Sequence, residues 1–417
     1  MKKNNVYLSK IALLLITAAM FVISCGSDDT KLVINSNQSD PAPKEALRVA
    51  IEQFKSENPK IEVTLNEYDH EAYKTAIRTW LPGDPPDVVY WFAGNRMNTF
   101  VKRDLFADVS DVWQDNGLYE KMSSTKDSLT VDGKQYGVPF SYYHWGVYYR
   151  KDIFDKLGIA VPKTWDEYLA ACEKLKSNGV TPVTIGTKFL WTAAGWFDYL
   201  NLRINGLAFH IDLMEGRVAY TDDRVKEVFK TWGEFIRKDY YLKDHSSYSW
   251  QEAQKFLYDG RAAMYLIGNF IVPGFPENLQ SSMSYFQFPI INTNVGVFED
   301  APTDTLHIPS KAKNKVAAKK FLSFMAQAEV QTAYNEELKQ IPPNKEASTL
   351  AGDPFLEAGL SVLSTADGTA QFYDRDSDPD MAKEGMKGFQ EFMIDPSRSD
   401  DILTRLEAAR ERVYGSL

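Results

Sequence analysis

The sequence predicts an α/β fold with doubly wound sheets, in which strands alternate with helices. Strand-like runs occur at residues 32–34, 61–65 and 87–92, whereas apolar residues recur at helical spacing over residues 45–56 and 70–80. This βαβαβ order is typical of a sheet covered by helices. The chain has 417 residues, which is long enough to divide into two domains.

Polar and aromatic side chains follow two of these strands. Tyr68 and Asp69 come directly after the second strand, and Trp91 lies near the end of the third, with Asn95 and Arg96 after it. Ligands of open α/β sheets bind outside the carboxyl ends of the strands. We therefore expect these five residues at a ligand cleft, where Trp91 offers a plane for stacking.

The middle and the end of the chain are richer in helical patterns. Thr164 and Glu167 have the spacing of a capping box before a helix that Gly179 ends. Cys172 falls on the apolar face of this helix and is predicted to be a small core thiol. A further amphipathic helix is expected at residues 317–328, and the tail is predicted to be mainly helical.

The N-terminus has the pattern of an export signal. Three lysines precede an uncharged run at residues 11–23, which is shorter than the roughly 20 residues of a membrane-spanning helix. The residues before Cys25 resemble the bacterial lipobox, which implies lipidation of Cys25. We therefore expect a signal peptide at 1–24, a lipidated tether at 25–31, and a mature protein anchored by lipid and facing the periplasm or the cell exterior.

Composition excludes some classes of protein. The formal net charge is −10, and without a basic stretch the chain is a poor candidate for nucleic-acid binding. Cys25 and Cys172 are the two cysteines, so no disulfide is expected within the chain if Cys25 carries lipid. The five histidines show no metal-ligand spacing.

Six motifs, in this order and spacing, resemble those of bacterial extracellular solute-binding proteins, in particular the carbohydrate-binding group related to maltodextrin-binding proteins. The motifs are PDVV at 86–89, DGKQYGVP at 132–139, YRKDIF at 149–154, PKTWDE at 162–167, GRAAM at 260–264 and AAKKFL at 317–322. The resemblance implies a receptor that captures a sugar for an ABC-importer permease, acts as a monomer and needs neither a cofactor nor covalent chemistry.

The resemblance also implies a type II periplasmic-binding-protein fold, with two α/β lobes, a ligand cleft between them, and crossing segments that act as hinges. The expected crossings lie near residues 143–147, 299–306 and 342–347. The expected first lobe comprises residues 32–142 with 302–341, and the second comprises 143–301 with 342–417.

A sugar ring offers an apolar C–H face and an edge of hydroxyl groups, which suit aromatic planes and polar side chains respectively. At the first crossing, where alternate side chains face opposite sides, we expect two of Tyr142, Tyr143, His144 and Trp145 to face the cleft, with His144 the more structural residue. The remaining candidates follow later strands or open a helix, and they are Lys188, Trp191, Trp250, Asn269 and, through the family resemblance, Asp304.

Three alternatives stay open at this point. A secreted carbohydrate-active enzyme would also combine aromatic residues with carboxylates, although the sequence contains no Gly-x-Ser-x-Gly, His-Glu-x-x-His or P-loop motif. Tyr142, Tyr143 and His144 invite comparison with ferric-binding members of the same superfamily. A lipoprotein with a structural or sensory role could reuse the same fold.

Overall fold

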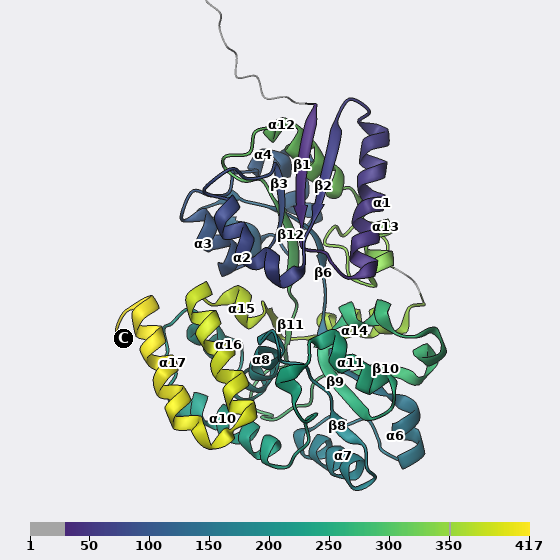
Figure 1. The fold of residues 1–417 in the computed structure, drawn as a ribbon, viewed down its shortest axis with the longest axis vertical. Helices are drawn as coiled ribbons and strands as arrows, with labels where there is room; N and C mark the ends of the chain where they lie inside the picture. Colours follow the sequence, from purple (N-terminus) through teal and green to yellow (C-terminus); the bar gives the residue numbers. More distant parts are fainter. Residues whose placement is uncertain (1–29, 350–351) are drawn as a thin grey trace, which may run out of the picture.

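The computed structural model describes residues 30–349 and 352–417. Two lobes, each with its own sheet and hydrophobic core, lie one above the other in Figure 1. The predicted signal peptide and Cys25 lie outside the described residues. Strand β1 begins at Lys31, within the range expected for the tether. Within residues 30–349 and 352–417, no helix combines the length and the apolar character that crossing a membrane requires.

The first lobe is built on a five-stranded sheet. Its strand order is β2-β1-β3-β12-β6, and β12 runs antiparallel to both of its neighbours. The insertion of β12 from late in the chain therefore makes the sheet mixed. The strands are β1 (Lys31–Ser36), β2 (Glu62–Glu67), β3 (Val88–Phe92), β6 (Val138–Tyr142) and β12 (Thr303–His307).

Helices cover this sheet. Helix α1 turns to the core the apolar stripe predicted within residues 45–56, which includes Leu47, Ala50, Ile51 and Phe54. Burial of such side chains stabilises the lobe by about 1.5–3 kcal/mol each. The first lobe also contains a short, separate hairpin of β4 (Thr130–Val131) and β5 (Lys134–Gln135). The helices are α1 (Pro41–Glu57), α2 (His70–Trp80), α3 (Asn95–Val101), α4 (Ser110–Asp115), α5 (Leu118–Lys121), α12 (Lys315–Met325) and α13 (Ala328–Leu338).

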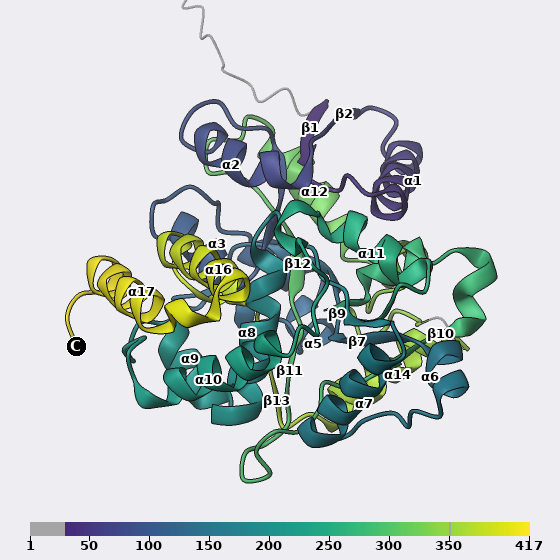
Figure 2. The ribbon, with the colours of Figure 1, turned by 60° about the horizontal axis from the view of Figure 1, so that its bottom comes forward.

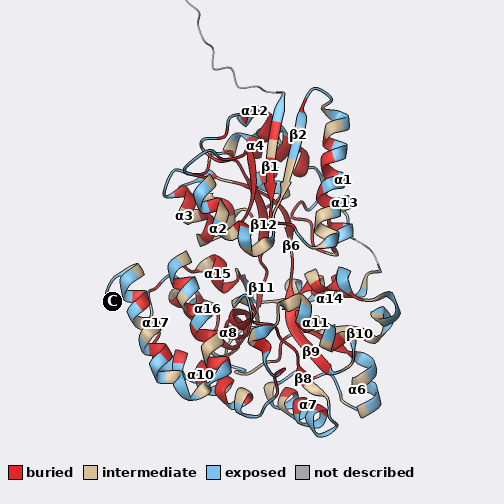
Figure 3. Ribbon diagram, viewed as in Figure 1, coloured by how far each residue is buried: buried red, intermediate tan, exposed pale blue. Residues whose placement is uncertain are grey.

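The second lobe has a four-stranded sheet of order β10-β7-β9-β8. Every residue of β7 and β9 is buried, as Figure 3 shows for β9, because helices pack on both faces of the sheet. A separate parallel pair, β11 and β13, joins the chain before the second crossing to the C-terminal region. The strands are β7 (Trp145–Arg150), β8 (Thr181–Val183), β9 (Ala262–Gly268), β10 (Met283–Phe286), β11 (Phe298–Asp300) and β13 (Gly368–Ala370).

The second lobe contains more helix than the first, as its sequence patterns predict. The last two long helices, α16 and α17, pack side by side (Figures 1 and 2). The helices are α6 (Lys151–Leu157), α7 (Trp165–Ser177), α8 (Trp191–Asn205), α9 (Leu207–Met214), α10 (Asp223–Arg237), α11 (Trp250–Tyr258), α14 (Pro354–Thr365), α15 (Tyr373–Asp376), α16 (Pro379–Ile394) and α17 (Ser399–Tyr414).

Crossing segments connect the lobes and lie against one another. Between β6 and β7 the chain crosses through Tyr143 and His144, and between β11 and β12 it crosses again. The Tyr143 N–H donates to the carbonyl of Pro302 (3.3 Å), and the Tyr142 N–H donates to the carbonyl of Ile341 (3.0 Å), where the chain leaves the first lobe towards α14. These bonds tie the crossings into one narrow waist between the lobes.

Local predictions for the middle of the chain are confirmed. Thr164 and Glu167 form a reciprocal capping box at the start of α7. Gly179 follows the end of this helix with a φ of 78°, a left-handed conformation that glycine adopts without strain. Cys172 is a free, fully buried thiol, and burial raises its pKa well above the usual range.

Candidate ligand-binding site

A cavity of about 280 Å³ lies between the two lobes and is lined by residues of both. The first lobe contributes the loop after β1, the start of α2, the carboxyl end of β3, and the start of β12, the antiparallel neighbour of β3. The second lobe contributes the starts of α8 and α11, the 3-10 turn after β9, and the residues around α15. Strand ends of both lobes therefore meet at one site, as expected for this type of sheet.

One side of the cavity is a cluster of five rings from the second lobe, here called the aromatic wall. Trp145 meets the Trp191 ring edge to face, with centroids 6.0 Å apart, and Phe270 lies 5.2 Å from Trp250 in the same manner. Such edge contacts fix ring orientation. Trp191, Trp250 and Phe270 are only half-buried, which leaves part of each ring open. The aromatic wall consists of Trp145, Trp191, Trp250, Phe270 and Phe372.

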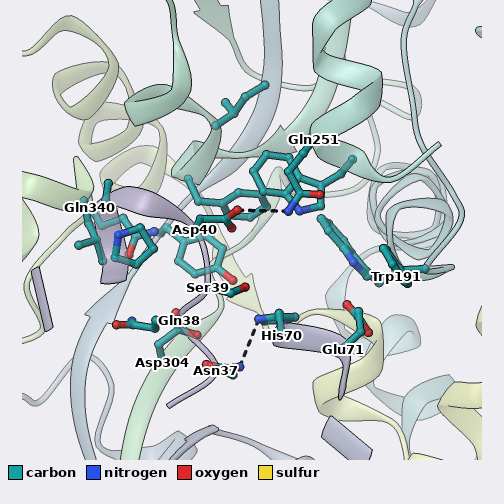
Figure 4. A pocket seen from close by; sticks show the side chains of 18 of the residues that line it. Asn37, Gln38, Ser39, Asp40, His70, Glu71, Trp191, Gln251, Asp304 and Gln340 are labelled. Atoms are coloured by element: carbon teal, nitrogen blue, oxygen red, sulfur yellow. Dashed lines mark hydrogen bonds between the residues drawn. The ribbon is translucent and has the colours of Figure 1, made fainter. Parts of the chain in front are cut away.

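The opposite side is polar and comes from the first lobe. Asn37 Nδ2 donates to His70 Nδ1 (3.2 Å, Figure 4), so the ring proton of neutral His70 is on Nε2. Burial, followed by the charges of Lys74 and Arg375, holds the pKa of His70 well below its ordinary value. We call Asn37, Gln38, Asp40 and His70 the polar wall.

Asn37 has an unused acceptor. Its side-chain oxygen is buried and has no hydrogen-bond partner in the structure, and Asn37 lines the cavity. On the aromatic wall, the indole N–H of Trp145 is likewise buried without a partner. An unpaired buried polar group costs about 1–3 kcal/mol, so a hydrogen bond to either atom would stabilise the protein.

The floor of the cavity is formed by Arg375 and the groups around it. Arg375 donates to the Tyr143 hydroxyl (2.8 Å), to Asp304 Oδ1 (3.1 Å) and to the Thr303 carbonyl (3.1 Å). Its guanidinium lies 4.3 Å from the centre of the Phe92 ring. Burial raises the pKa of Asp304, and the charge of Arg375 opposes that rise. Arg375 thus connects the second lobe to a strand of the first.

Part of the predicted set lies at this cavity. Asp69 and Asp304 from the first lobe, Tyr143 at the first crossing, and Trp145, Trp191 and Trp250 from the second lobe all line it. Asp69 also caps α2, because its carboxylate accepts from the N–H groups of Glu71 and Ala72. The structure therefore brings together residues that are more than 200 positions apart in the sequence.

Trp91 does not line the cavity. Its side chain is 2% exposed and packs on Phe100, with ring centroids 5.2 Å apart, in the core of the first lobe. Its neighbours Tyr90 and Phe92 line the cavity instead, because successive side chains of a strand point to opposite faces. The structure therefore does not support the stacking role expected of Trp91. In β3 it is Phe92 that offers a ring to the cavity.

Asn95 and Arg96 act between the lobes and not on the cavity. Asn95 Nδ2 donates to the carbonyl of Asp376 (2.5 Å), and Arg96 forms a buried ion pair with Asp374 (2.6 Å). Asp374 and Asp376 both lie on α15 of the second lobe. The hydrogen-bonding capacity that suggested ligand contacts for these two side chains is therefore used to join α3 to α15.

The remaining predicted residues also lie outside the lining. Tyr68 packs on Trp80, with ring centroids 4.7 Å apart, and Tyr142 is half-buried at the crossing, where burial raises its pKa. Asn269 donates to the carbonyl of Lys339. Lys188 is exposed, with its ammonium 5.7 Å from the ring of Phe189. None of these four side chains meets the cavity.

Several lining residues escaped the sequence analysis. The loop after β1, with Asn37 and Asp40, could have been found by the same strand-end rule that selected Asp69. Phe270 directly follows Asn269, so the correct loop was selected with the wrong residue. Phe372 and Arg375 carried no signal, because their position depends on the return of the C-terminal region to the waist.

The three side chains that invited comparison with ferric-binding proteins do not converge. The Tyr143 hydroxyl accepts from Arg375, and His144 Nε2 is 3.1 Å from the Tyr148 hydroxyl. Burial raises the pKa of Tyr143 far above its ordinary range, which disfavours the phenolate that iron requires. In the part of the chain that the structure describes, no cluster of three or more His, Cys, Asp or Glu side chains is suited to a metal ion.

Comparison with known proteins identifies the family. The family model for bacterial extracellular solute-binding proteins matches residues 39–332. The chain therefore belongs to this family, and the predicted resemblance is confirmed. An uncharacterized ABC transporter extracellular-binding protein of Pyrococcus horikoshii is 29% identical over 332 residues, which are 78% of this chain and 74% of that protein.

Two further similarities bear on the fold and the family. The multiple sugar-binding protein of Streptococcus mutans is 25% identical over 315 residues, 74% of each chain. The structure of the bacterial solute receptor AcbH, described as having an exclusive preference for β-D-galactopyranose, matches with a TM-score of 0.85 and 31% identity over 92% of this chain and 97% of its own. The predicted type II periplasmic-binding-protein fold is confirmed by this match.

Proposed function

We propose that this protein captures a carbohydrate in the cavity between its lobes and delivers it to an ABC-importer permease, by binding alone and without covalent chemistry. The observation that carries the proposal is an aromatic wall facing a polar wall across one cavity. Rings such as Trp191 suit the C–H face of a sugar, and groups such as Asn37 suit its hydroxyls. The sugar-binding relatives support the same class of ligand.

The size of the cavity favours a small sugar. Its volume of about 280 Å³ lies just below the roughly 300 Å³ at which the usual range of small-molecule pockets begins. A mono- or disaccharide is therefore the ligand we propose, and the preference described for AcbH makes galactose the first one to test.

Thermal shift against a sugar panel tests this function. A ligand present at 100 times its dissociation constant stabilises the folded state by about 2.7 kcal/mol, so at least one of D-galactose, D-glucose, D-xylose, maltose and raffinose should raise the melting temperature. The rise should be lost in Trp191→Ala and kept in Tyr119→Ala, an exposed aromatic residue outside the cavity. If no sugar raises the melting temperature, carbohydrate capture is wrong.

The delivery step requires a hinge and an anchor. We propose that residues 32–142 with 302–341 move against residues 143–301 with 342–417 about the crossings at Tyr143 and Pro302, so that the closed form is the one the permease distinguishes. The short crossings and the bonds between them support rotation at the waist.

We also propose that lipid on Cys25 holds the protein close to its permease and so raises its effective concentration there. The apolar run at residues 11–23 and the lipobox-like residues before Cys25 support this anchor. Mass spectrometry of the mature N-terminus should find a diacylglycerol-modified Cys25, and Cys25→Ser should move the protein to the soluble fraction. An unmodified cysteine in membrane-bound protein would contradict the anchor.

A further inference from the structure

The N-terminus of α1 opens on the cavity but lacks the usual donors. Residues Asp40, Pro41, Ala42 and Pro43 all line the cavity. A helix N-terminus normally presents free N–H groups and the positive end of the helix dipole, which together attract anions. Proline has no N–H, so the prolines at the first and third helical positions leave Ala42 as the one N–H donor among the first three residues.

Asp40 places a negative charge at this same helix end. It occupies the N-cap position, yet its side chain makes no capping hydrogen bond. Its Oδ1 atom instead accepts from Gln251 Nε2 of the second lobe (3.2 Å, Figure 4). Burial is the main cause of a raised pKa for Asp40, which means that water solvates this carboxylate poorly. The positive end of the α1 dipole is therefore already matched by a charge of the protein.

The cations that line the described cavity are already paired. Lys74 pairs with Glu71 (3.1 Å), and Arg375 pairs with Asp304 (3.1 Å). Lys44, in the first turn of α1, pairs with Glu67 (3.1 Å) and does not line the cavity. An anionic ligand could therefore pair with Lys74 or Arg375 only by displacing the carboxylate that already binds it.

The remaining charged groups add negative charge. Asp374 has the buried partner Arg96, and His70 is neutral because burial lowers its pKa. Asp40 and Asp69 have no ion pair in the described chain, and Asp69 is satisfied by the N–H groups that it caps. The lining thus has an excess of carboxylate, and of the two aspartates without an ion pair, Asp40 is the one that contacts the other lobe.

We propose that this cavity selects ligands by the sign of their charge, and that Asp40, followed by Pro41 and Pro43, excludes anionic sugars while neutral and amine-bearing sugars are accepted. The proposal rests on the proposed function and specifies its ligand class. At the effective dielectric constant typical of sites near a protein surface, one like charge at contact distance weakens binding by at least about 100-fold.

Isothermal titration at pH 7.5 with matched sugars tests the sign of the selection. The two series are D-galactose, D-galacturonate and D-galactosamine, and D-glucose, D-glucuronate and D-glucosamine. For the neutral sugar that binds, the uronate should bind at least about 100-fold more weakly, whereas the amino sugar should stay within tenfold. Because the amino sugar carries a positive charge, its affinity shows whether the cavity rejects negative charge in particular or any charge at all.

Two variants test the residues. Asp40→Asn keeps the size of the side chain. It should reduce the gap in affinity, which is the ratio of the dissociation constant of the uronate to that of the neutral sugar, at least tenfold. The double substitution Pro41→Ala and Pro43→Ala restores two N–H donors and should also narrow it. Glu234→Gln, which removes one exposed carboxylate on α10 away from the cavity, should leave the gap unchanged.

The outcomes are distinguishable. A uronate that binds the wild type within threefold of the neutral sugar, or binds when no neutral sugar does, overturns the charge selection but leaves solute capture intact. If the uronate and the amino sugar are excluded equally, or if the gap in affinity is unchanged in Asp40→Asn, then Asp40 does not exclude anionic sugars. Absence of binding by every sugar in the titrations and in the thermal-shift panel overturns the proposed function, and the charge selection with it.

Discussion

The two walls of the cavity differ in chemistry and in the way they are held. The polar wall of the first lobe consists of side chains fixed by directional hydrogen bonds, such as the bond between Asn37 and His70. The aromatic wall of the second lobe consists of rings that pack edge to face, such as Trp145 and Trp191. Rings contribute apolar contact area, whereas polar groups select orientation. We therefore expect the aromatic wall to supply most of the affinity for a ligand and the polar wall to select its orientation.

Tryptophans in the two lobes provide the largest expected contrast. Trp91→Ala removes a ring from the core of the first lobe and should lower the free energy of unfolding by about 3–5 kcal/mol. Trp191→Ala removes an open ring of the aromatic wall and should instead weaken sugar binding by about 1.5–3 kcal/mol. Urea unfolding and isothermal titration on both variants measure the two effects. Loss of affinity in a stable Trp91→Ala protein would contradict the contrast.

Asp376 makes the stability of the protein sensitive to pH. Burial raises its pKa from 3.8 to about 7, so the folded protein holds the proton more tightly than the unfolded chain. Its contribution to stability is therefore fully present below about pH 3.8 and is lost as the pH rises through 7. At about 1.4 kcal/mol per pKa unit, the loss reaches at most about 4 kcal/mol.

The measurement is the difference in unfolding free energy between wild type and Asp376→Asn from pH 4.5 to 7.5. The wild type should lose stability relative to the variant across this range. The control Glu234→Gln should follow the wild type. A difference that does not change with pH would show that Asp376 has an ordinary pKa in the folded protein.

Arg375 tests whether the cavity floor joins the two walls. Arg375→Met leaves Asp304 buried without its cation and should destabilise the protein by about 3 kcal/mol in urea unfolding. Adding Asp304→Asn removes the unpaired charge and should restore at least half of the loss. If the unfolding free energy of Arg375→Met lies within 1 kcal/mol of the wild-type value, the pair of Arg375 and Asp304 does not join the two lobes.

The smallest expected effect concerns the bond between the walls. Gln251→Ala removes the hydrogen bond to Asp40 and should change the affinity for a neutral sugar by about 1 kcal/mol, the usual contribution of one such bond. Isothermal titration measures it, with Gln53→Ala on the exposed side of α1 as the matched control. An effect as large as that of Trp191→Ala would mean that orientation and affinity are not separated between the lobes.

Much of the fold could be predicted because its signals are local. The helix expected at residues 70–80 coincides with α2, and the capping box of Thr164 and Glu167 begins α7. These features depend on residues within one or two turns of each other, so periodicity and end groups reveal them. The antiparallel insertion of β12 between β3 and β6 depends on pairing across more than 150 residues, which no local pattern shows.

The candidate site could be predicted in part. The start of a helix led to Trp250, and the strand-end rule led to Asp69 and Trp191. It failed to separate Trp91 from Phe92, because all five residues of β3 are buried. A strand buried on both faces has no alternation of polarity to show which face meets the cavity.

The sequence by itself determined the class of the protein, through its strand and helix pattern and its ordered motifs. Tertiary structure decided which side chains form the site. Arg375 reaches the floor because β13 pairs with β11 and brings α15 back to the waist. Asp40 meets Gln251 because the lobes lie against each other. Both contacts are made between segments more than 70 residues apart, so their geometry is set by packing and not by local conformational preference.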